Sequence, residues 1–277
     1  MGRSLPCALA IGGLDPGGGA GVIADLRAFA AAGAFGAAAV ALVTVQSTGG
    51  LRSTRALSSR LVAAQAREVI EQQRVRAVKV GALGTLDNVR GVSALLDEFD
   101  ALPVVIDTPM RPTRGEARLL APAAIAVLRD TLVPRATVLT VNLAEARALL
   151  GNAVLTLDDA RGAALALARL GPGAALVKGG HLSGRMAIDV LAIDNRVIEL
   201  RSPRLDLGSM HGTGCTLASL IAGRLARCRV RPVGSGAIIA AVRWAKRVHH
   251  AALSRAVDVG GPARVIVFES RRIGQVM

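Results

Sequence analysis

The chain has 277 residues, of which 52% are apolar and only 2% aromatic, so its core must be built mainly from Ala, Val, Leu and Ile. This apolar content excludes a largely disordered chain. The formal net charge of +14 would suit a nucleic-acid partner if it were clustered, but the arginines are scattered and no run reaches five like charges. We therefore expect a folded protein that binds no nucleic acid.

The predicted elements follow a simple order. Short β-branched or apolar runs alternate with longer Ala/Leu-rich segments of helical spacing, which predicts a mostly parallel sheet with helical crossovers on both faces. The strands are expected at residues 8–12, 38–44, 77–80, 104–107, 138–140 and 174–178. The helices between them are expected at residues 20–32, 61–73, 87–99, 122–132, 143–150 and 157–170.

The pattern changes after residue 178. Two runs at 187–193 and 197–200 flank the turn-forming pair Asp194-Asn195, which predicts an antiparallel hairpin. Two long helices at 216–227 and 233–255 and a short strand at 264–268 complete the chain. Because no linker or repeat interrupts this order, we expect one α/β domain over residues 1–277.

The three cysteines, Cys7, Cys215 and Cys228, are odd in number and have no partner at metal-binding spacing. This argues against a disulfide framework or a zinc site. No signal peptide is visible, and the longest apolar stretch, residues 34–45, is too short to span a bilayer. We expect a cytoplasmic protein without a membrane segment.

Two glycine-rich segments are candidates for ligand binding. The first, residues 12–21, follows the first strand, where α/β proteins bind ligands, but it lacks the Walker spacing and could be only a flexible turn. The second, residues 211–216, precedes a helix, so its backbone amides and the helix dipole would form an anion site. Cys215 falls in the first helical turn, where we expect a favoured thiolate and a proton acceptor, although a lone cysteine is more often a packing residue.

With these motifs taken together, the chain resembles the hydroxymethylpyrimidine/phosphomethylpyrimidine kinases of thiamine biosynthesis. Six segments match in family order, at residues 8–26, 78–84, 107–110, 142–146, 177–181 and 211–216. The resemblance implies a ribokinase-like fold, ATP and Mg²⁺ as cofactors, a homodimer, and phosphoryl transfer from ATP to 4-amino-5-hydroxymethyl-2-methylpyrimidine and then to its monophosphate.

The resemblance also implies roles for residues on the nucleotide side. Cys215 would be the base, with Gly212 and Gly214 stabilising the transferred group, and Lys178, His211 and Thr213 would contact the nucleotide. Asn142 and Glu145 would organise Mg²⁺, which prefers oxygen ligands. The same two residues also have the spacing of a helix capping box, which is the alternative interpretation. His181, His249 and His250 are interpreted as structural.

For the acceptor substrate, the family's pyrimidine pocket corresponds to Cys215 and a set of other residues. That set is Gly13, Asp25, Gln46, Ala82 and Pro109. The family commonly has Met at position 82, Val at 109, and Asn-Thr where this chain has Ser209-Met210. These departures leave open a pyridoxal kinase of the same fold, or a non-catalytic nucleotide-binding or pyrimidine-binding regulatory protein.

Overall fold

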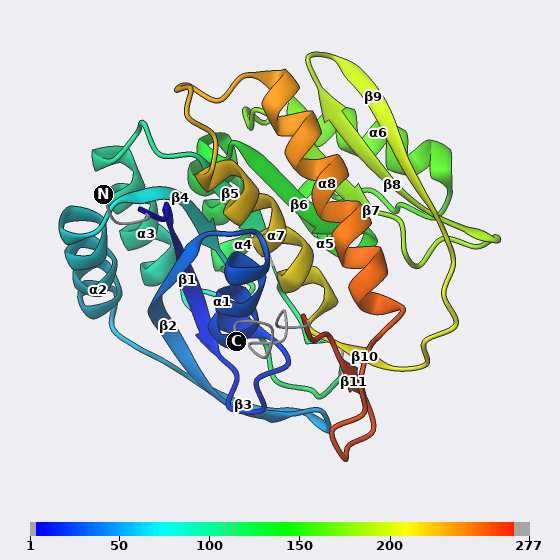
Figure 1. Cartoon of the computed structure of the whole chain (residues 1–277), viewed down its shortest axis with the longest axis horizontal. Helices are drawn as coiled ribbons and strands as arrows, with labels where there is room; N and C mark the ends of the chain where they lie inside the picture. Colours follow the sequence, from blue (N-terminus) through cyan, green and yellow to red (C-terminus); the bar gives the residue numbers. More distant parts are fainter. Residues whose placement is uncertain (1–3, 108, 113, 269–277) are drawn as a thin grey trace, which may run out of the picture.

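The computed structural model describes residues 4–107, 109–112 and 114–268. In these ranges nine strands form one sheet, in the order β3-β2-β1-β4-β5-β6-β7-β8-β9 (Figure 1). Their bounds are β1 (Cys7–Leu14), β2 (Phe35–Ser47), β3 (Gly50–Ala56), β4 (Val75–Val80), β5 (Val104–Asp107), β6 (Val138–Asn142), β7 (Ala175–Lys178), β8 (Met186–Ile193) and β9 (Arg196–Pro203). Strands β2, β1, β4, β5, β6 and β7 run parallel, whereas β3, β8 and β9 extend the two edges with antiparallel pairs.

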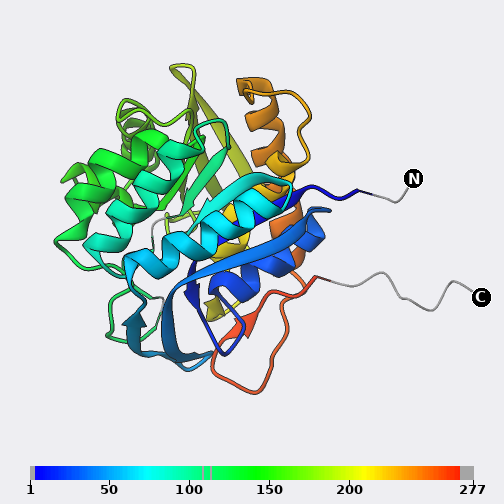
Figure 2. The ribbon, with the colours of Figure 1, turned by 90° about the vertical axis from the view of Figure 1, so that its left-hand side faces the viewer.

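Helices cover both faces of this sheet, as Figure 2 shows from the side. On one face lie α1 (Gly21–Ala31), α7 (Thr213–Ala226) and α8 (Ser235–Leu253), whose apolar side chains share one core cluster. The other face carries α2 (Ser59–Gln72), α3 (Leu86–Glu98), α4 (Ala124–Val127), α5 (Leu143–Leu150) and α6 (Leu157–Ala168), and α4 continues as a π-helical segment (Leu128–Leu132) and a 3-10 turn (Val133–Arg135). The expected mostly parallel sheet with helices on both faces is confirmed.

Local sequence signals explain where several helices begin. The side chains of Ser58 and Thr85 accept hydrogen bonds from backbone amides in the first turns of α2 and α3. Thr156 and Asp159 form a reciprocal capping box at the start of α6. Each cap satisfies amides that have no partner within the helix.

The predicted hairpin is confirmed by β8 and β9. Asp194 and Asn195 adopt positive φ angles of 49° and 59°, which short polar residues tolerate and which a tight hairpin turn requires. Two strands were not predicted. β3 is almost wholly exposed after Leu51 and so has no apolar alternation, and β10 (Met210–His211) has only two residues and pairs with β11 (Arg264–Val265).

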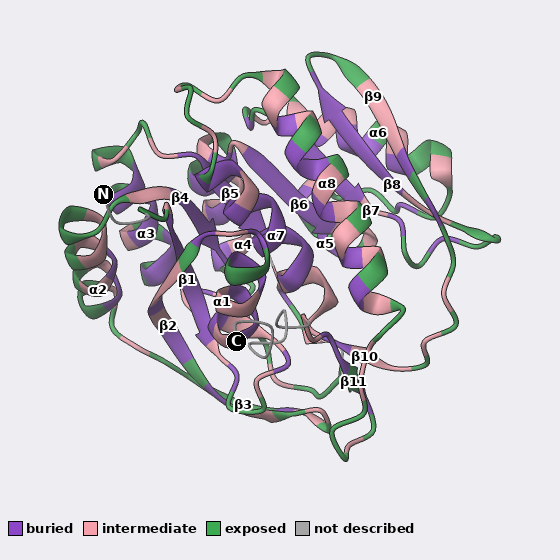
Figure 3. Cartoon of the chain, viewed as in Figure 1, coloured by how far each residue is buried: buried purple, intermediate pink, exposed green. Residues whose placement is uncertain are grey.

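The strand order indicates where in the sheet a ligand site is expected. The chain passes from β1 to β2 on one side and then returns to β4 on the other side of β1, so crossovers diverge between β1 and β4. In open α/β sheets, ligands bind beyond the carboxyl ends of the strands at such a point. Figure 3 shows the central strands buried between the helical layers. In the described part of the chain, no helix has the length and apolar character needed to cross a membrane.

Candidate active site

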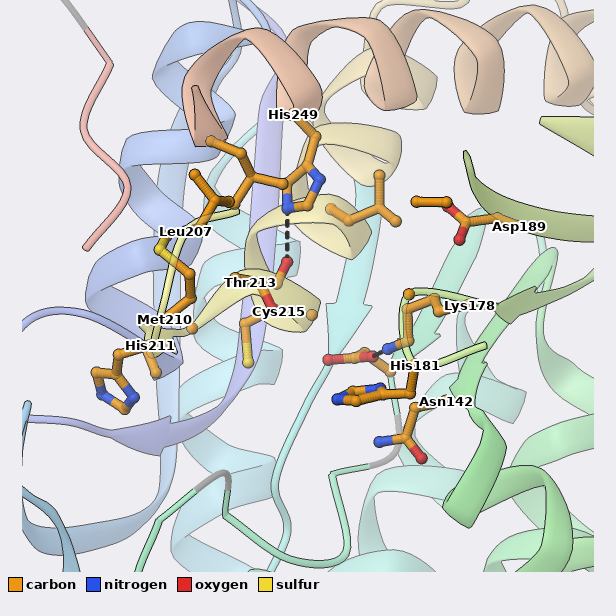
Figure 4. A pocket seen from close by; sticks show the side chains of 18 of the residues that line it. Asn142, Lys178, His181, Asp189, Leu207, Met210, His211, Thr213, Cys215 and His249 are labelled. Atoms are coloured by element: carbon orange, nitrogen blue, oxygen red, sulfur yellow. Dashed lines mark hydrogen bonds and ion pairs between the residues drawn. The ribbon is translucent and has the colours of Figure 1, made fainter. Parts of the chain in front are cut away.

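A cavity of about 390 Å³ lies at the carboxyl edge of the sheet. Its lining comes from strand ends, from the start of α7 and from the last turns of α8 (Figure 4). The lining residues that the sequence singled out are Gln46, Pro109, Asn142, Glu145, Lys178, His211, Gly212, Thr213, Gly214 and Cys215. The fold therefore brings ten candidate residues, from segments far apart in the sequence, to one space.

Contacts of Asp15 connect the residues just before α7 to the first glycine-rich loop. Asp15 accepts hydrogen bonds from the amides of Gly17 and Ala20, both at 2.9 Å, and its carboxylate lies 2.8 Å from Nε2 of His211. Burial opposes the charge of Asp15, but the contacts with His211 and the two amides outweigh it and lower the pKa of this carboxyl. Gly212 has a φ of 75°, and a Cβ there would lie 1.9 Å from a backbone oxygen of the loop, so glycine is required.

A buried cluster of charges lies beneath the start of α7. The ammonium of Lys178 is 2.7 Å from Oδ1 of Asp107 and 4.0 Å from Oε2 of Glu145. Burial disfavours the charge of Lys178, but attraction to the two carboxylates is stronger and raises its pKa above the usual value. A Cβ at Gly214 would lie 3.2 Å from this ammonium, so the glycine lets the helix approach the charge closely.

Asn142 and Glu145 form the capping box that was the alternative interpretation. Asn142 accepts from the amide of Glu145 at 2.8 Å, and Glu145 accepts from the amide of Asn142 at 2.7 Å. Both side chains also line the cavity, so the two interpretations are compatible. Burial raises the pKa of Glu145 to about 7, with Lys178 opposing the shift and Asp107 adding to it.

Cys215 points into the space between His211 on one side and Lys178, His181 and Asn142 on the other (Figure 4). The expectation that the helix start favours its thiolate is wrong. Burial raises the pKa of this thiol to about 11, and the attraction of Lys79 and the amide of Gly21 only partly offset that effect and the repulsion from Asp107 and Asp25.

The expected pyrimidine contacts divide into two groups. Gln46 and Pro109 line the cavity, whereas Gly13 and Ala82 lie against each other near the ends of β1 and β4 and are not among the lining residues. The expected contact of Asp25 with the substrate is not supported. Asp25 is fully buried, and its oxygens bind Lys79 at 3.0 Å and the Ser219 hydroxyl at 2.7 Å.

The interpretation of the three histidines was incomplete, because His181, His249 and His250 all line the cavity. Nε2 of His249 donates to the carbonyl of Thr213 at 2.9 Å and so ties α8 to the start of α7. Burial lowers the pKa of His249 to about 3, so its ring is neutral at pH 7. No spacing in the sequence could indicate this contact between residues 36 positions apart.

Three further residues of the site were not identified from sequence. Asp107 lines the cavity beside Gly214, although its position at the end of a predicted strand was a signal for it. Asp189 binds the ammonium of Lys246 at 2.5 Å and the amide of Gly179 at 3.0 Å. Arg204 donates to the carbonyls of Gly180 and Gly184, at 2.6 and 2.8 Å, and to that of Leu182, and thereby holds the loop that follows β7.

Comparison with known proteins agrees with this geometry. The sequence profile described as phosphomethylpyrimidine kinase matches residues 15–266. The chain belongs to this family. It is 40% identical over 251 residues to the hydroxymethylpyrimidine/phosphomethylpyrimidine kinase of Rhizobium meliloti, covering 90% of this chain and 91% of that protein. It is 41% identical over 256 residues to the enzyme of that name from Streptomyces coelicolor, covering 92% and 91%.

The fold is also similar to a solved structure of a different kinase. An ADP complex of Bacillus subtilis pyridoxal kinase superposes with a TM-score of 0.84 and 29% identity, covering 95% of this chain and 97% of that one. The family assignment made from the six sequence motifs is thus confirmed. Pyridoxal kinase activity stays the alternative, because phosphomethylpyrimidine kinases and this pyridoxal kinase share one fold.

The raised pKa of Glu145 predicts a pH-dependent cost to stability. Its folded-state pKa of about 7 exceeds the ordinary glutamate value of 4.5, so the unfolded chain loses the proton more readily and stability falls as pH rises from 4.5 to 7. Glu145→Gln keeps an acceptor for the cap but carries no charge. We expect it to raise the free energy of unfolding at pH 8 by about 1–3 kcal/mol, with little change at pH 4.5.

Urea denaturation of the ligand-free protein at both pH values measures this difference. Glu98→Gln is the matched control, because Glu98 is an exposed carboxylate on α3 paired with Arg67, and its pKa is lowered rather than raised. A loss of stability in Glu145→Gln at pH 8 would show that the capping role outweighs the electrostatic cost.

Proposed function

We propose that this phosphomethylpyrimidine kinase transfers the γ-phosphoryl group of ATP to the hydroxymethyl oxygen of 4-amino-5-hydroxymethyl-2-methylpyrimidine, and then phosphorylates the resulting monophosphate, in thiamine biosynthesis. The observation that carries this proposal is the convergence of Gly212, Gly214 and Cys215 with Lys178 in one cavity. Amides at a helix start, a lysine and a proton acceptor are the groups that phosphoryl transfer requires.

The cavity supports two binding regions on either side of Cys215. Gln46 and Pro109 lie at the ends of the strands nearer to β1, where Gln46 offers both an amide donor and an acceptor for the edge of an aminopyrimidine. On the other side, β8, β9 and α8 contribute Lys246, His249 and His250. We assign the first region to the acceptor and the second to the nucleotide, with Thr213 beside its phosphates. The expected nucleotide contact of His211 is not part of this assignment, because its ring pairs with Asp15 on the other side of Cys215 (Figure 4).

In the proposed mechanism, the amides around Gly212 and Gly214 stabilise charge on the transferred group, and Lys178 offsets charge on the nucleotide phosphates. The hydroxymethyl O–H bond breaks as its oxygen attacks the γ-phosphorus, and Sγ of Cys215 accepts that proton. Cys215 must be a thiolate at that moment, so groups that oppose its raised pKa contribute to the rate.

The residues beside Lys178 fit a magnesium ion. Burial is the main cause of the raised pKa of Glu145, and Asp107 adds to it, so a cation beside this carboxyl would favour its charged form. In the described ranges no group of three or more His, Cys, Asp or Glu residues could hold a metal ion without other ligands. Mg²⁺ commonly takes one or two carboxylates together with substrate phosphates. Asn142 and Glu145 would hold it, and it would supply neutralisation of the phosphate charge.

A pyridoxal kinase is the second candidate. Its support is the similarity to the Bacillus subtilis pyridoxal kinase structure, together with Ala82 and Pro109, where the family commonly has Met and Val. Of these two, Pro109 lines the cavity. A non-catalytic nucleotide-binding role has less support, because the chain retains the glycines, lysine, carboxylate and cysteine that transfer requires, all in one cavity.

One assay tests these alternatives. We expect ATP-dependent phosphorylation of the hydroxymethylpyrimidine and its monophosphate, with pyridoxal slower, and we expect Cys215→Ala to lower kcat by about 10²–10⁴-fold because it removes the proton acceptor. Nucleotide affinity, measured by calorimetry, should persist. Cys228→Ala is the control, since Cys228 is also free but does not line the cavity. Faster turnover of pyridoxal would select the second candidate.

The metal proposal predicts a change in magnesium demand. Glu145→Gln replaces a carboxylate with a neutral amide, so the Mg²⁺ concentration that gives half-maximal rate should rise by about tenfold or more. A Mg²⁺ titration of the initial rate measures it, with Glu98→Gln as the control that leaves the titration unchanged. An unaltered titration in Glu145→Gln would limit Glu145 to the capping role.

The proposal includes a cytoplasmic homodimer. All three cysteines are free, which suits a reducing compartment. The ribbon of β2 and β3 exposes Val43 and Val45, at 41% and 56%, beside the cavity residue Gln46, and an interface would cover these apolar side chains. We expect sedimentation velocity to give a dimer and Val45→Asp to shift it towards monomer, with Val230→Asp, exposed at 77%, as the control. A monomeric natural chain would contradict this.

A further inference from the structure

A second lysine lies under the cavity in a fully buried ion pair. Lys79 on β4 is 1% exposed and Asp25 on α1 is 0% exposed, and Nζ of Lys79 is 3.0 Å from Oδ2 of Asp25. The hydroxyl of Ser219 on α7 donates to Oδ1 of Asp25 at 2.7 Å. Apolar residues of similar volume often replace such a pair without loss of stability, so stability alone does not account for it.

Helical spacing places this pair one turn below Cys215. Ser219 follows Cys215 by four residues on α7, and Asp25 follows Gly21 by four residues on α1, so each couple shares a helix face. The amide of Gly21 lies against the thiol of Cys215, and Asp25 bonds Ser219 one turn further along. The two helices therefore meet in two successive layers, with the reactive thiol in one layer and the carboxylate that holds Lys79 in the next.

The ammonium of Lys79 has capacity beyond its bond to Asp25. An ammonium has three donors, and within the described residues one of them is used, in the hydrogen bond to Asp25. A Cβ at position 81 would lie 2.7 Å from Nζ, so the lysine fits there because residue 81 is glycine. Burial opposes the charge of Lys79, but attraction to Asp25, Cys215 and Asp107 raises its pKa above the usual value, and the group stays cationic.

Charged groups face Cys215 from four elements. Lys79 on β4 attracts a thiolate, as does the amide of Gly21, while Asp107 on β5 and Asp25 on α1 repel it. Lys178 on β7 also interacts with the charge of Cys215. Lys79 is the strongest of the attractions that act on this thiol, and it is opposed by burial and two carboxylates.

We propose that Lys79 is a positioning residue for phosphoryl transfer, whose buried ammonium, fixed by Asp25 and Ser219, is the counter-charge that makes the thiolate of Cys215 accessible. Asp25 fixes the ammonium and attenuates its charge. The inference rests on the proposed function of Cys215 as proton acceptor. When the substrate oxygen bonds the γ-phosphorus, its proton moves to Sγ, and the electrons of the broken P–O bond leave with ADP.

Thiol reactivity in the full ligand-free chain tests this without relying on turnover. Iodoacetamide alkylates the thiolate, and mass spectrometry of the digested protein follows Cys215 separately, with Cys7 and Cys228 as internal controls. At pH 8.5 we expect Lys79→Met to slow alkylation of Cys215 by about three- to tenfold, because the thiolate population falls about tenfold per pKa unit while its nucleophilicity rises partly in return.

Substitution of Asp25, the partner of Lys79, should change the alkylation rate of Cys215 in the opposite direction. Asp25→Asn keeps an acceptor for Lys79 and Ser219 but removes a repelling charge, so Cys215 should be alkylated about two- to fivefold faster than in the natural chain. The double variant Lys79→Met/Asp25→Asn should lie between the single variants. A purely structural pair would not give opposite signs, since breaking it from either side only destabilises the fold.

The outcomes separate this inference from the proposed function. Unchanged or faster alkylation in Lys79→Met, or unchanged or slower alkylation in Asp25→Asn, overturns the role of Lys79. If Lys79→Met does not fold, Lys79→Gln replaces it, because its amide keeps a donor to Asp25 without the charge, and the sign of its effect on alkylation decides. If alkylation follows the expected pattern but Cys215→Ala keeps full kinase activity, the electrostatic link stands, whereas Cys215 is not the acceptor and the proposed role in transfer is lost.

Discussion

The geometry of the cavity at the carboxyl edge of the sheet depends on three buried or partly buried pairs of lysine and aspartate. The chain has three lysines among 34 basic residues, and each of them pairs with an aspartate at or beneath the cavity. Lys79 joins β4 to α1, Lys178 joins β7 to β5, and Lys246 joins α8 to β8. The space around one of these ammonium groups is tight, since a Cβ at position 81 would lie 2.7 Å from Nζ of Lys79. The pairs fix the site's geometry more than they stabilise the fold.

The second constraint is that backbone segments must approach one another and the buried charges closely at the site. This constraint depends on the lysine–aspartate pairs. The start of α7 lies above the charges of Lys178 and Asp107, where Gly214 lets the helix come near. Asp15 and His211 then hold the first glycine-rich loop against the same helix start, at the point where Gly212 requires a positive φ. Substitution at one glycine would therefore displace the loop and the helix start together.

Most of the fold could be predicted because it follows from local signals. Apolar runs predicted the parallel strands, helical spacing predicted the crossover helices, and Asp194-Asn195 predicted the hairpin turn. β3 could not be predicted because its side chains face solvent and its pairing with β2 leaves no periodic pattern. Six motifs in family order were enough to identify the family, and the family's sequence profile matches residues 15–266.

The site was harder to predict because its chemistry depends on burial and on partners distant in sequence. A helix start predicts a favoured thiolate, but in the structure Cys215 is partly buried near Asp25 and Asp107, and desolvation is the stronger effect. Asp25 follows the glycine-rich loop and suggested a substrate contact, yet Lys79 and Ser219 occupy its oxygens. Similarly, the role of His249 depends on the carbonyl of Thr213, a backbone atom that no motif reveals.

Buried carboxylates line the cavity of a chain whose net charge is positive, and this arrangement bears on how the proposed substrate would be bound. A net charge of +14 attracts an anionic nucleotide from a distance. Within the cavity, however, the raised pKa values of Glu145 and Cys215 show that burial and nearby carboxylates already disfavour further negative charge. A nucleotide carrying a bound cation would bring less negative charge to these carboxylates than a bare nucleotide would. The long-range field thus favours anionic ligands in general, and the buried carboxylates favour those that arrive with their charge partly neutralised.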